Sequence, residues 1–135
     1  QNYHAYIHHY SIRSYNGPRN SIHPKTWMLE GSNDKIHWVT LDKQKDCDYL
    51  NGKNLSHAFP IMSENNQAYQ IIRLCQTDFN CANSDFLCFK SIEFYGDWDY
   101  SCDFYVGNQN EANLISNNKT CKIYIYCLNN ILIFI

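Results

Sequence analysis

Apolar and polar residues alternate along the first part of the chain with the period of a β-strand. In the segment 3–13 every second side chain falls on the same face, which is the repeat of two that a strand requires. The segment ends at Asn16-Gly17-Pro18, where glycine and proline favour a loop. We therefore predict a long first strand with two faces. One carries Tyr6, His8, Tyr10 and Ile12, and the other carries Ala5, Ile7, His9 and Ser11.

Further strand patterns follow at short intervals, separated by glycine- and asparagine-rich turns such as Gly31-Ser32-Asn33-Asp34. No segment between them has the period of an amphipathic helix. This spacing favours an antiparallel sandwich or barrel over a βαβ architecture. The predicted strands are Lys25–Glu30, Ile36–Leu41, Leu55–Met62, Tyr69–Cys75 and Phe86–Tyr95. The fold class expected from the pattern is therefore all-β.

The pattern changes after Trp98. Asparagine becomes frequent, and isoleucine, tyrosine and cysteine cluster without alternation. The sequence predicts one domain over residues 1–98 and an irregular C-terminal tail over residues 99–135, which is either disordered or not genuine coding sequence. The apolar run Ile131–Ile135 is too short to span a bilayer, so no transmembrane segment is predicted.

Several separated motifs within residues 3–98 share an order and spacing with one family. They are Tyr10-Ser11-Ile12-Arg13-Ser14, the run from His23 to Asp34 with Trp38 and Leu41 after it, Tyr69-Gln70-Ile71-Ile72-Arg73-Leu74, and Ile92-Glu93-Phe94-Tyr95-Gly96. Together they resemble the coagulation factor V/VIII type C, or discoidin, domain. The residues of these motifs are most similar to those of protist discoidin domains that occur beside BTB domains.

The resemblance implies a jelly-roll β-sandwich that is only partial. Members of the family have further strands ahead of the position that corresponds to Tyr3, and this sequence lacks them. Strand edges and an apolar face would then be left uncovered. The resemblance also implies that the chain is a fragment of a longer protein with a BTB-type domain.

Composition narrows the classes of partner. Lysine and arginine number 11 against 13 aspartate and glutamate, a net charge of −2, so the chain lacks the positive field that attracts nucleic acid. The 7 cysteines are odd in number and show no paired spacing, which favours reduced thiols and a cytoplasmic location. A secreted or cell-surface location is the alternative.

Five residues are predicted to have structural roles. Trp27 and Leu29 share one strand face and should enter the core, with Trp38 as a neighbour across the turn. Arg73 lies between apolar residues, where an unpaired guanidinium would be costly. We expect it to meet a carboxylate, either that of Glu93 or that of Glu30, or to project to the solvent edge.

The sequence contains no pattern typical of a catalytic or cofactor site. His4, His8 and His9 are close together, but no cysteine or acid accompanies them, so packing roles are favoured over a metal site. No nucleophile elbow, phosphate-binding glycine loop or metalloprotease helix is present. We predict no enzyme activity, no metal and no cofactor.

In the resembling family, ligands contact loops at one end of the sandwich. The corresponding loop is Ser14–His23, where Tyr15, Arg19 and His23 are the candidate ligand-binding residues. A second candidate loop runs over Asp78–Asp85 and contributes Phe79 and Asn80. A tyrosine can stack on a sugar or a partner side chain, and an arginine can bind a carboxylate.

Three functional hypotheses remain. The first is a non-catalytic module that mediates protein–protein interaction within a larger multidomain adaptor containing a BTB-type domain. The second is a carbohydrate- or lipid-binding module of a secreted or cell-surface protein. The third is a fragment without independent function, because its sandwich cannot be completed. Fold alone does not decide among them.

Overall fold

The computed structural model describes residues 4–98, 120–123 and 131–134. These residues form eight strands, and none of them lies in a helix. The strands are β1 (Ala5–Arg13), β2 (Trp27–Ser32), β3 (Val39–Gln44), β4 (Ser56–Pro60), β5 (Ile71–Gln76), β6 (Ser91–Trp98), β7 (Thr120–Ile123) and β8 (Ile131–Phe134). The prediction of an all-β chain is confirmed.

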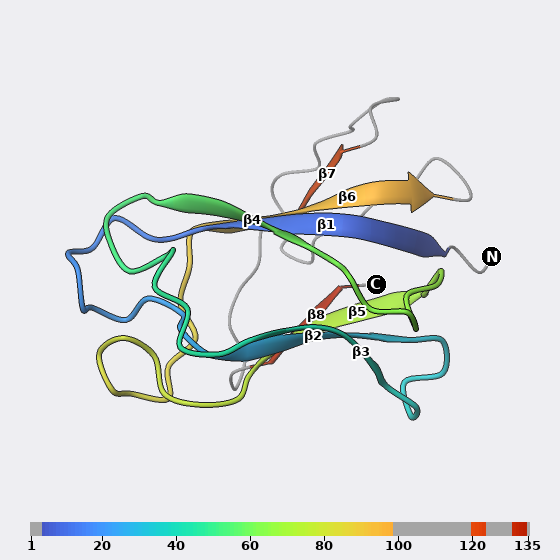
Figure 1. Cartoon of the computed structure of the whole chain (residues 1–135), viewed down its shortest axis with the longest axis horizontal. Coiled ribbons are helices and arrows are strands. Elements are labelled where there is room, and N and C mark those ends of the chain that lie inside the picture. Colours follow the sequence, from blue (N-terminus) through green and yellow to red (C-terminus); the bar gives the residue numbers. More distant parts are fainter. Residues whose placement is uncertain (1–3, 99–119, 124–130, 135) are drawn as a thin grey trace, which may run out of the picture.

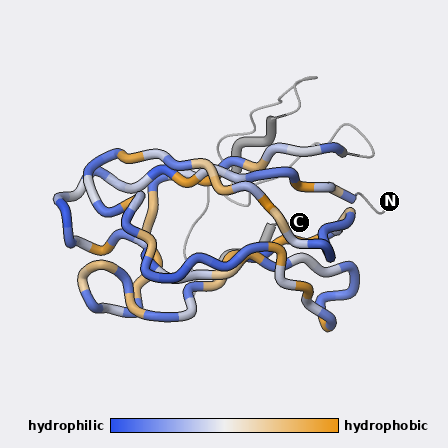
Figure 2. The backbone as a smooth tube through the Cα atoms, in the orientation of Figure 1, coloured by the Kyte–Doolittle hydropathy of each residue, from blue (hydrophilic) through white to orange (hydrophobic). Residues whose placement is uncertain are grey.

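The strands form two antiparallel sheets that lie face to face (Figure 1). One sheet has the order β4-β1-β6-β7 and the other has the order β3-β2-β5-β8. Apolar and polar stretches are interleaved along both sheets (Figure 2), as expected when one face of each sheet packs on a shared core. The chain is therefore a β-sandwich of partial extent.

The core between the sheets is built from large side chains of both layers. Tyr10, Phe59 and Phe94 come from one sheet, and Trp27 and Leu29 come from the other; none is more than 2% exposed. The Phe59 ring meets the Trp27 ring edge-on, with centroids 5.2 Å apart. Such edge-to-face contacts add to the free energy of burying the rings.

One polar link crosses this core. The Trp27 indole Nε1 donates to the Tyr10 hydroxyl oxygen at 2.9 Å, and that hydroxyl donates to Asp42 Oδ2 at 2.6 Å. Tyr10 lies on β1, while Trp27 and Asp42 lie on β2 and β3 of the other sheet. Burial raises the pKa of Tyr10 well above its usual range, and the Asp42 carboxylate raises it further. The link therefore requires a protonated tyrosine.

The six strands predicted before Trp98 are all present, but their ends differ from the prediction. The largest difference is in the last of them, which was expected to begin at Phe86 and begins at Ser91. The Asn80 side-chain amide donates to the Phe86 carbonyl oxygen at 2.8 Å. This contact holds Phe86 in the preceding loop.

A β-bulge also corrects the predicted faces of β1. The register with β6 pairs Ile7 with Gly96 and His9 with Tyr95, so His8 is the extra residue. Ala5 and Ile7 face the core before the bulge, whereas Tyr10 and Ile12 face it afterwards. Uninterrupted alternation was therefore wrong, because one extra residue exchanges the two faces.

Two short strands lie within residues 99–135, where the sequence predicted no regular structure. β7 pairs with β6, with Ile92 opposite Ile123, and β8 pairs with β5, with Ile72 opposite Phe134. Each adds to a sheet edge that would otherwise present unpaired backbone groups. The other residues of this segment lie outside the described part of the chain, as does the proposed boundary of the tail.

Candidate functional site

Three long loops meet at one end of the sandwich, on the left in Figure 1. They connect β1 to β2, β3 to β4 and β5 to β6, and backbone hydrogen bonds join each to another. Ser14 N donates to Leu55 O at 2.8 Å, and Cys81 N donates to His23 O at 3.0 Å. Because the bonds run between loops and not only within them, this end of the molecule forms a single unit, which we call the loop end.

Side chains reinforce the loop end. The Ser14 hydroxyl donates to Gly52 O at 2.6 Å and accepts from Leu55 N at 2.8 Å. Asn51 accepts from Asn20 N at 2.6 Å, and its amide donates back to the Asn20 side chain at 2.9 Å. Asn20 has a positive φ of 62°, a conformation that asparagine tolerates better than most residues. Short polar residues thus hold these loops in defined conformations.

Tyr15 is half-buried and braces the first loop. Its hydroxyl is hydrogen-bonded to Ser21 Oγ, and its ring lies 4.8 Å from the His23 ring, tilted by 37°. The ring also covers Gly17, where an added Cβ would lie 2.1 Å from a ring carbon. Only glycine leaves room for this arrangement. The ring therefore packs against its own loop.

His23 is fully buried, although the sequence made it a candidate for ligand contact. Its Nε2 lies 2.8 Å from Pro18 O, and because a carbonyl only accepts, this nitrogen carries the proton. Nδ1 is buried and has no hydrogen-bond partner among the described residues. His23 thus packs inside the loop end beneath Tyr15.

Arg19 is exposed and pairs with Asp48 of the β3–β4 loop. Its Nη2 donates to Asp48 Oδ2 at 2.8 Å. A hydrogen bond from Asn51, followed by that from Arg19, lowers the pKa of Asp48. Both side chains are more than 60% exposed, so the pair adds little to stability. Arg19 remains accessible to a carboxylate or another acceptor.

Asn80 is the buried centre of the β5–β6 loop. Its amide nitrogen donates to Ser84 Oγ and to Phe86 O, both at 2.8 Å. Its side-chain oxygen accepts from Ala82 N at 2.9 Å and from Ser84 N at 3.1 Å. With these bonds satisfied internally, Asn80 shapes the loop. The large apolar side chains that this loop exposes are those of Phe79, 51% exposed, and Phe86, 55% exposed.

Two surface aromatic residues of the loop end were missed by sequence reasoning. Phe86 had been assigned to a strand. Tyr49 lies flat on the His57 ring, with centroids 4.0 Å apart and an angle of 6° between the planes, and it is 62% exposed. Both are aromatic residues within polar stretches of sequence. This pattern could have indicated surface positions, because a loop offers such residues no core of its own.

Of the residues predicted to be structural, Trp27, Leu29, Arg73 and Glu93 lie in the sheets, and Trp38 immediately precedes β3. Trp27 and Leu29 are buried. Arg73 Nε donates to Glu30 Oε2 at 2.5 Å, and the half-buried Trp38 ring covers the guanidinium at 3.7 Å. Glu93, the other expected partner, lies on β6 in the opposite sheet and accepts from Tyr95 Oη at 2.6 Å.

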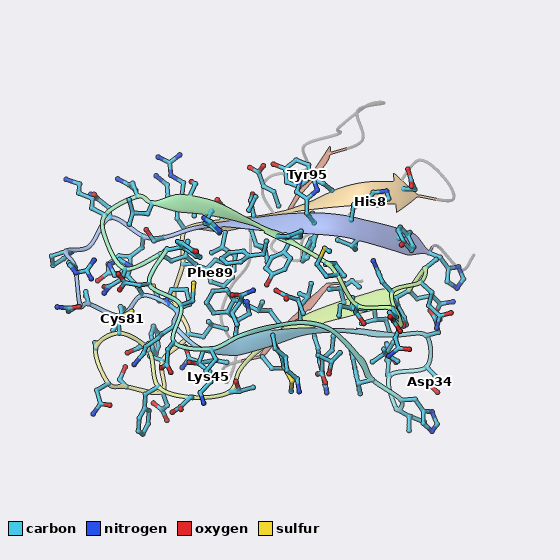
Figure 3. The ribbon with its side chains drawn as sticks, viewed as in Figure 1. His8, Asp34, Lys45, Cys81, Phe89 and Tyr95 are labelled. Atoms are coloured by element: carbon cyan, nitrogen blue, oxygen red, sulfur yellow. The ribbon has the colours of Figure 1, made fainter. Side chains whose placement is uncertain are left out.

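The neighbouring histidines of β1 have separate partners. His8 Nε2 lies 2.8 Å from Asp97 Oδ2, and the His9 ring stacks on Tyr95 at 4.4 Å. His8 and Tyr95 lie on the outer face of their sheet (Figure 3). Within the described residues, no three histidine, cysteine or acidic side chains are grouped so as to hold a metal ion.

The cysteines of residues 4–98 carry free thiols. They are Cys47, Cys75, Cys81 and Cys88. Burial raises the pKa of each of them. Because the thiolate is the reactive form, these thiols are poor nucleophiles near neutral pH.

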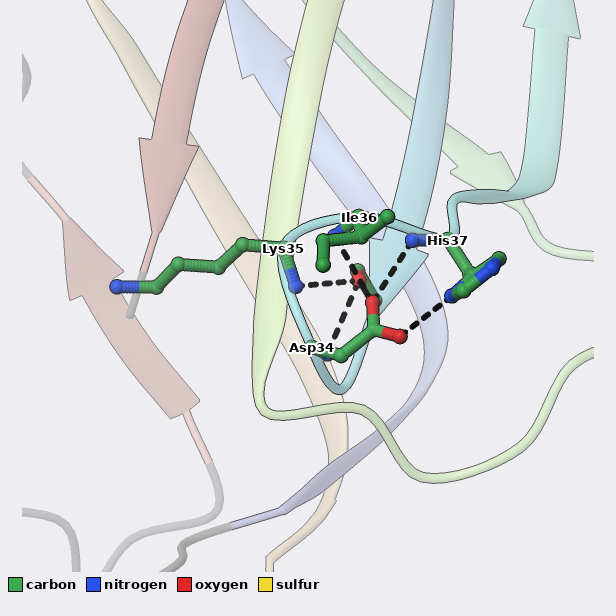
Figure 4. Close-up of polar contacts among 5 residues, drawn as sticks. Asp34, Lys35, Ile36 and His37 are labelled. Atoms are coloured by element: carbon green, nitrogen blue, oxygen red, sulfur yellow. Dashed lines mark hydrogen bonds and ion pairs between the residues drawn. The ribbon is translucent and has the colours of Figure 1, made fainter.

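At the opposite end, Asp34 accepts several of the hydrogen bonds that order the β2–β3 turn (Figure 4). Asp34 Oδ1 accepts from Ile36 N at 2.8 Å and from His37 N at 2.7 Å. Asp34 Oδ2 lies 2.6 Å from His37 Nδ1. These bonds, led by that from the His37 side chain, lower the pKa of Asp34. Ile36 is presented at this turn, 76% exposed.

No family model and no curated protein matches this chain. Within the described residues, no helix has the length and hydrophobicity needed to cross a membrane.

Proposed function

We propose that the chain is a non-catalytic binding module, a partial discoidin-like jelly roll that mediates protein–protein interaction in a larger adaptor. The motifs around Trp27, Arg73 and Phe94 support the family, and the two-sheet sandwich is compatible with it. The similarity to protist domains found beside BTB domains supports the adaptor context and a cytoplasmic location.

The observation that carries the proposal is the pair of exposed phenylalanines on a braced loop. Phe79 and Phe86 are about half exposed, while Asn80 between them is buried and hydrogen-bonded. Aromatic side chains on a preorganised loop lose little conformational freedom on binding, which is typical of binding hot spots. Arg19 on the neighbouring loop adds an accessible cation.

The polar side chains of the loop end favour binding over catalysis. Ser14, Asn51 and Asn80 are engaged in bonds that join or shape the loops. The buried His23 ring bonds to the carbonyl of its own loop. The accessible groups include aromatic rings and two ion pairs, Arg19–Asp48 and Lys25–Asp46, which serve recognition.

A crosslinking experiment tests the proposal. A photoreactive phenylalanine analogue replaces Phe79 in the full-length protein in its native cells, and crosslinked proteins are identified by mass spectrometry. A partner captured at this position should no longer co-purify with the Phe79→Ser/Phe86→Ser variant. Ile36→Ser, which removes an exposed apolar residue from the opposite end, should leave its recovery unchanged. Equal recovery from both variants would contradict a role for the loop end.

A carbohydrate ligand is the second candidate, and Tyr49 is the observation that favours it. Its ring is fixed on one face by His57 and is 62% exposed, the geometry on which a sugar ring stacks. The exposed Arg19–Asp48 pair on the same loops supplies polar partners. A glycan array probed with the chain and with Tyr49→Ala should show signals lost only in the variant. No signal above background from either protein would exclude this candidate.

A further inference from the structure

β4 forms an edge of its sheet, and one side of its backbone has no neighbouring strand among the described residues. The hydrogen bonds to β1 use alternate residues: Ser14 N donates to Leu55 O at 2.8 Å, and Ile61 N donates to His8 O at 2.9 Å. In an antiparallel ladder the intervening residues direct their N–H and C=O groups the other way. Ser56, Ala58 and the Pro60 carbonyl therefore face outward, and none of these backbone groups bonds to another described residue.

β3, an edge strand of the other sheet, carries charged residues and an irregular pairing that β4 lacks. β3 carries the charged residues Asp42 and Lys43, and its pairing with β2 contains an irregularity between Leu29 and Glu30. Charges and bulges are the usual means by which a sheet edge resists another strand. β4 instead exposes Ser56 and Ala58, which are small and uncharged. Only Pro60, which lacks a donor, limits pairing.

We propose that β4 pairs with β4 of a second copy of this chain, antiparallel across a twofold axis at Ala58. The two Ala58 residues then exchange N–H···O=C bonds. Ser56 N–H donates to the Pro60 carbonyl of the other copy. The reciprocal bond to the Ser56 carbonyl is missing, because Pro60 has no N–H. The edge is thus complementary to itself, as a twofold interface requires.

Exposed apolar residues at both ends of β4 fit the same register. Leu55 is 41% exposed and Met62 is 83% exposed. Antiparallel pairing centred on Ala58 places Met62 of one copy opposite Asn54 of the other, next to Leu55. Contact between them removes apolar surface from water in both copies. Because the ladder is short, the dimer is weak and reversible.

Sedimentation velocity over a range of concentrations tests the pairing with the 135-residue chain. The wild type should change from monomer to dimer as concentration rises. Ala58→Pro removes the central donor on the free edge without removing a bond to β1, and should weaken dimerisation by at least about tenfold. Ala58→Lys places two like charges opposite each other and should do the same. Ala82→Lys, which adds the same charge on an exposed loop, should dimerise like the wild type.

Hydrogen exchange locates the interface. The amides of Ser56 and Ala58 should exchange more slowly as the protein concentration rises, while those of the β3 edge should not change. A wild type that stays monomeric at all accessible concentrations overturns the proposal. So does a dimer that both Ala58 variants leave intact. Phe79 and Phe86 take no part in this contact, so failure here leaves the function proposed for the loop end unaffected.

Discussion

Arg73 shows how one charged residue is accommodated on an otherwise apolar strand. Its Nε lies 2.5 Å from Glu30 Oε2, and the Trp38 ring covers the guanidinium. The Glu30 side chain is only 8% exposed and that of Arg73 24%. A carboxylate this deeply buried needs its cation, since burying an unpaired charge is costly.

Arg73→Ala should therefore destabilise the sandwich by about 3 kcal/mol, because Glu30 would remain buried without its partner. Urea unfolding followed by tryptophan fluorescence measures the change. The double variant Arg73→Met/Glu30→Leu should recover most of the lost stability, since it removes both charges and keeps the apolar contacts. A single variant as stable as wild type would show that the pair contributes nothing.

The role of a single residue could be predicted where burial allows only one kind of partner. It could not be predicted where several partners or positions were possible. An arginine between Ile72 and Leu74 requires a carboxylate, but two glutamates fitted the sequence, and only the sheet order places Glu30 opposite Arg73. Tyr15, His23 and Asn80 looked like surface loop residues. They turn inward because these long loops bury a small polar core of their own, which no local pattern in the sequence records.

Two side chains order the β2–β3 turn: Ser32, whose Oγ accepts from Lys35 N at 3.0 Å, and Asp34. Asp34 accepts from the Ile36 and His37 amides, and Lys35 has a positive φ of 65°. Asp34→Ala should leave both amides without an acceptor and speed their hydrogen exchange by about tenfold. Asp46→Ala, at another exposed aspartate in a turn, is the matched control and should leave the exchange of these two amides unchanged.

The same turn should respond to acid. The folded state lowers the pKa of Asp34. The stabilisation of the turn by the Asp34 carboxylate is therefore complete above its unfolded-state pKa near 4, and it is lost as pH falls through its folded-state pKa. Protection of the Ile36 amide, corrected for intrinsic exchange, should therefore decline at acid pH in the wild type. In Asp34→Ala it should already be low and should not depend on pH. Parallel profiles in the two proteins would rule out this role.

Strands could be predicted where an alternating apolar pattern is bounded by turn residues. The strands before Trp98 are separated by polar loops that contain turn residues, and all six were found. The bulge at His8 was not, because Tyr6 to Ile12 alternates well in either phase and aromatic residues suit both faces. The pairing with β6 determines where the bulge lies. Gly96 of β6 is so close to β1 that an added Cβ would come within 1.9 Å of Tyr6 O. Such long-range contacts are absent from a local pattern.

The two sheets are joined through the core by the Trp27–Tyr10–Asp42 link, so its protonation concerns the whole molecule. Trp27 and Asp42 lie in one sheet and Tyr10 in the other. Tyr10→Phe keeps the ring but leaves the Trp27 indole N–H unpaired in the core. At pH 8 it should lower the free energy of unfolding by about 2 kcal/mol.

This cost should shrink at alkaline pH. The folded pKa of Tyr10 is raised, so the stability it contributes is complete below the unfolded value near 10. It falls above that value, by about 1.4 kcal/mol per pH unit, because only the unfolded state releases the proton. The comparison with Tyr10→Phe isolates the contribution of this one hydroxyl. Urea unfolding from pH 8 to 11.5 should show the stabilities of wild type and Tyr10→Phe converging above about pH 10. A constant difference would mean that Tyr10 ionises as easily in the folded core as in water, and that the link between the sheets does not depend on its proton.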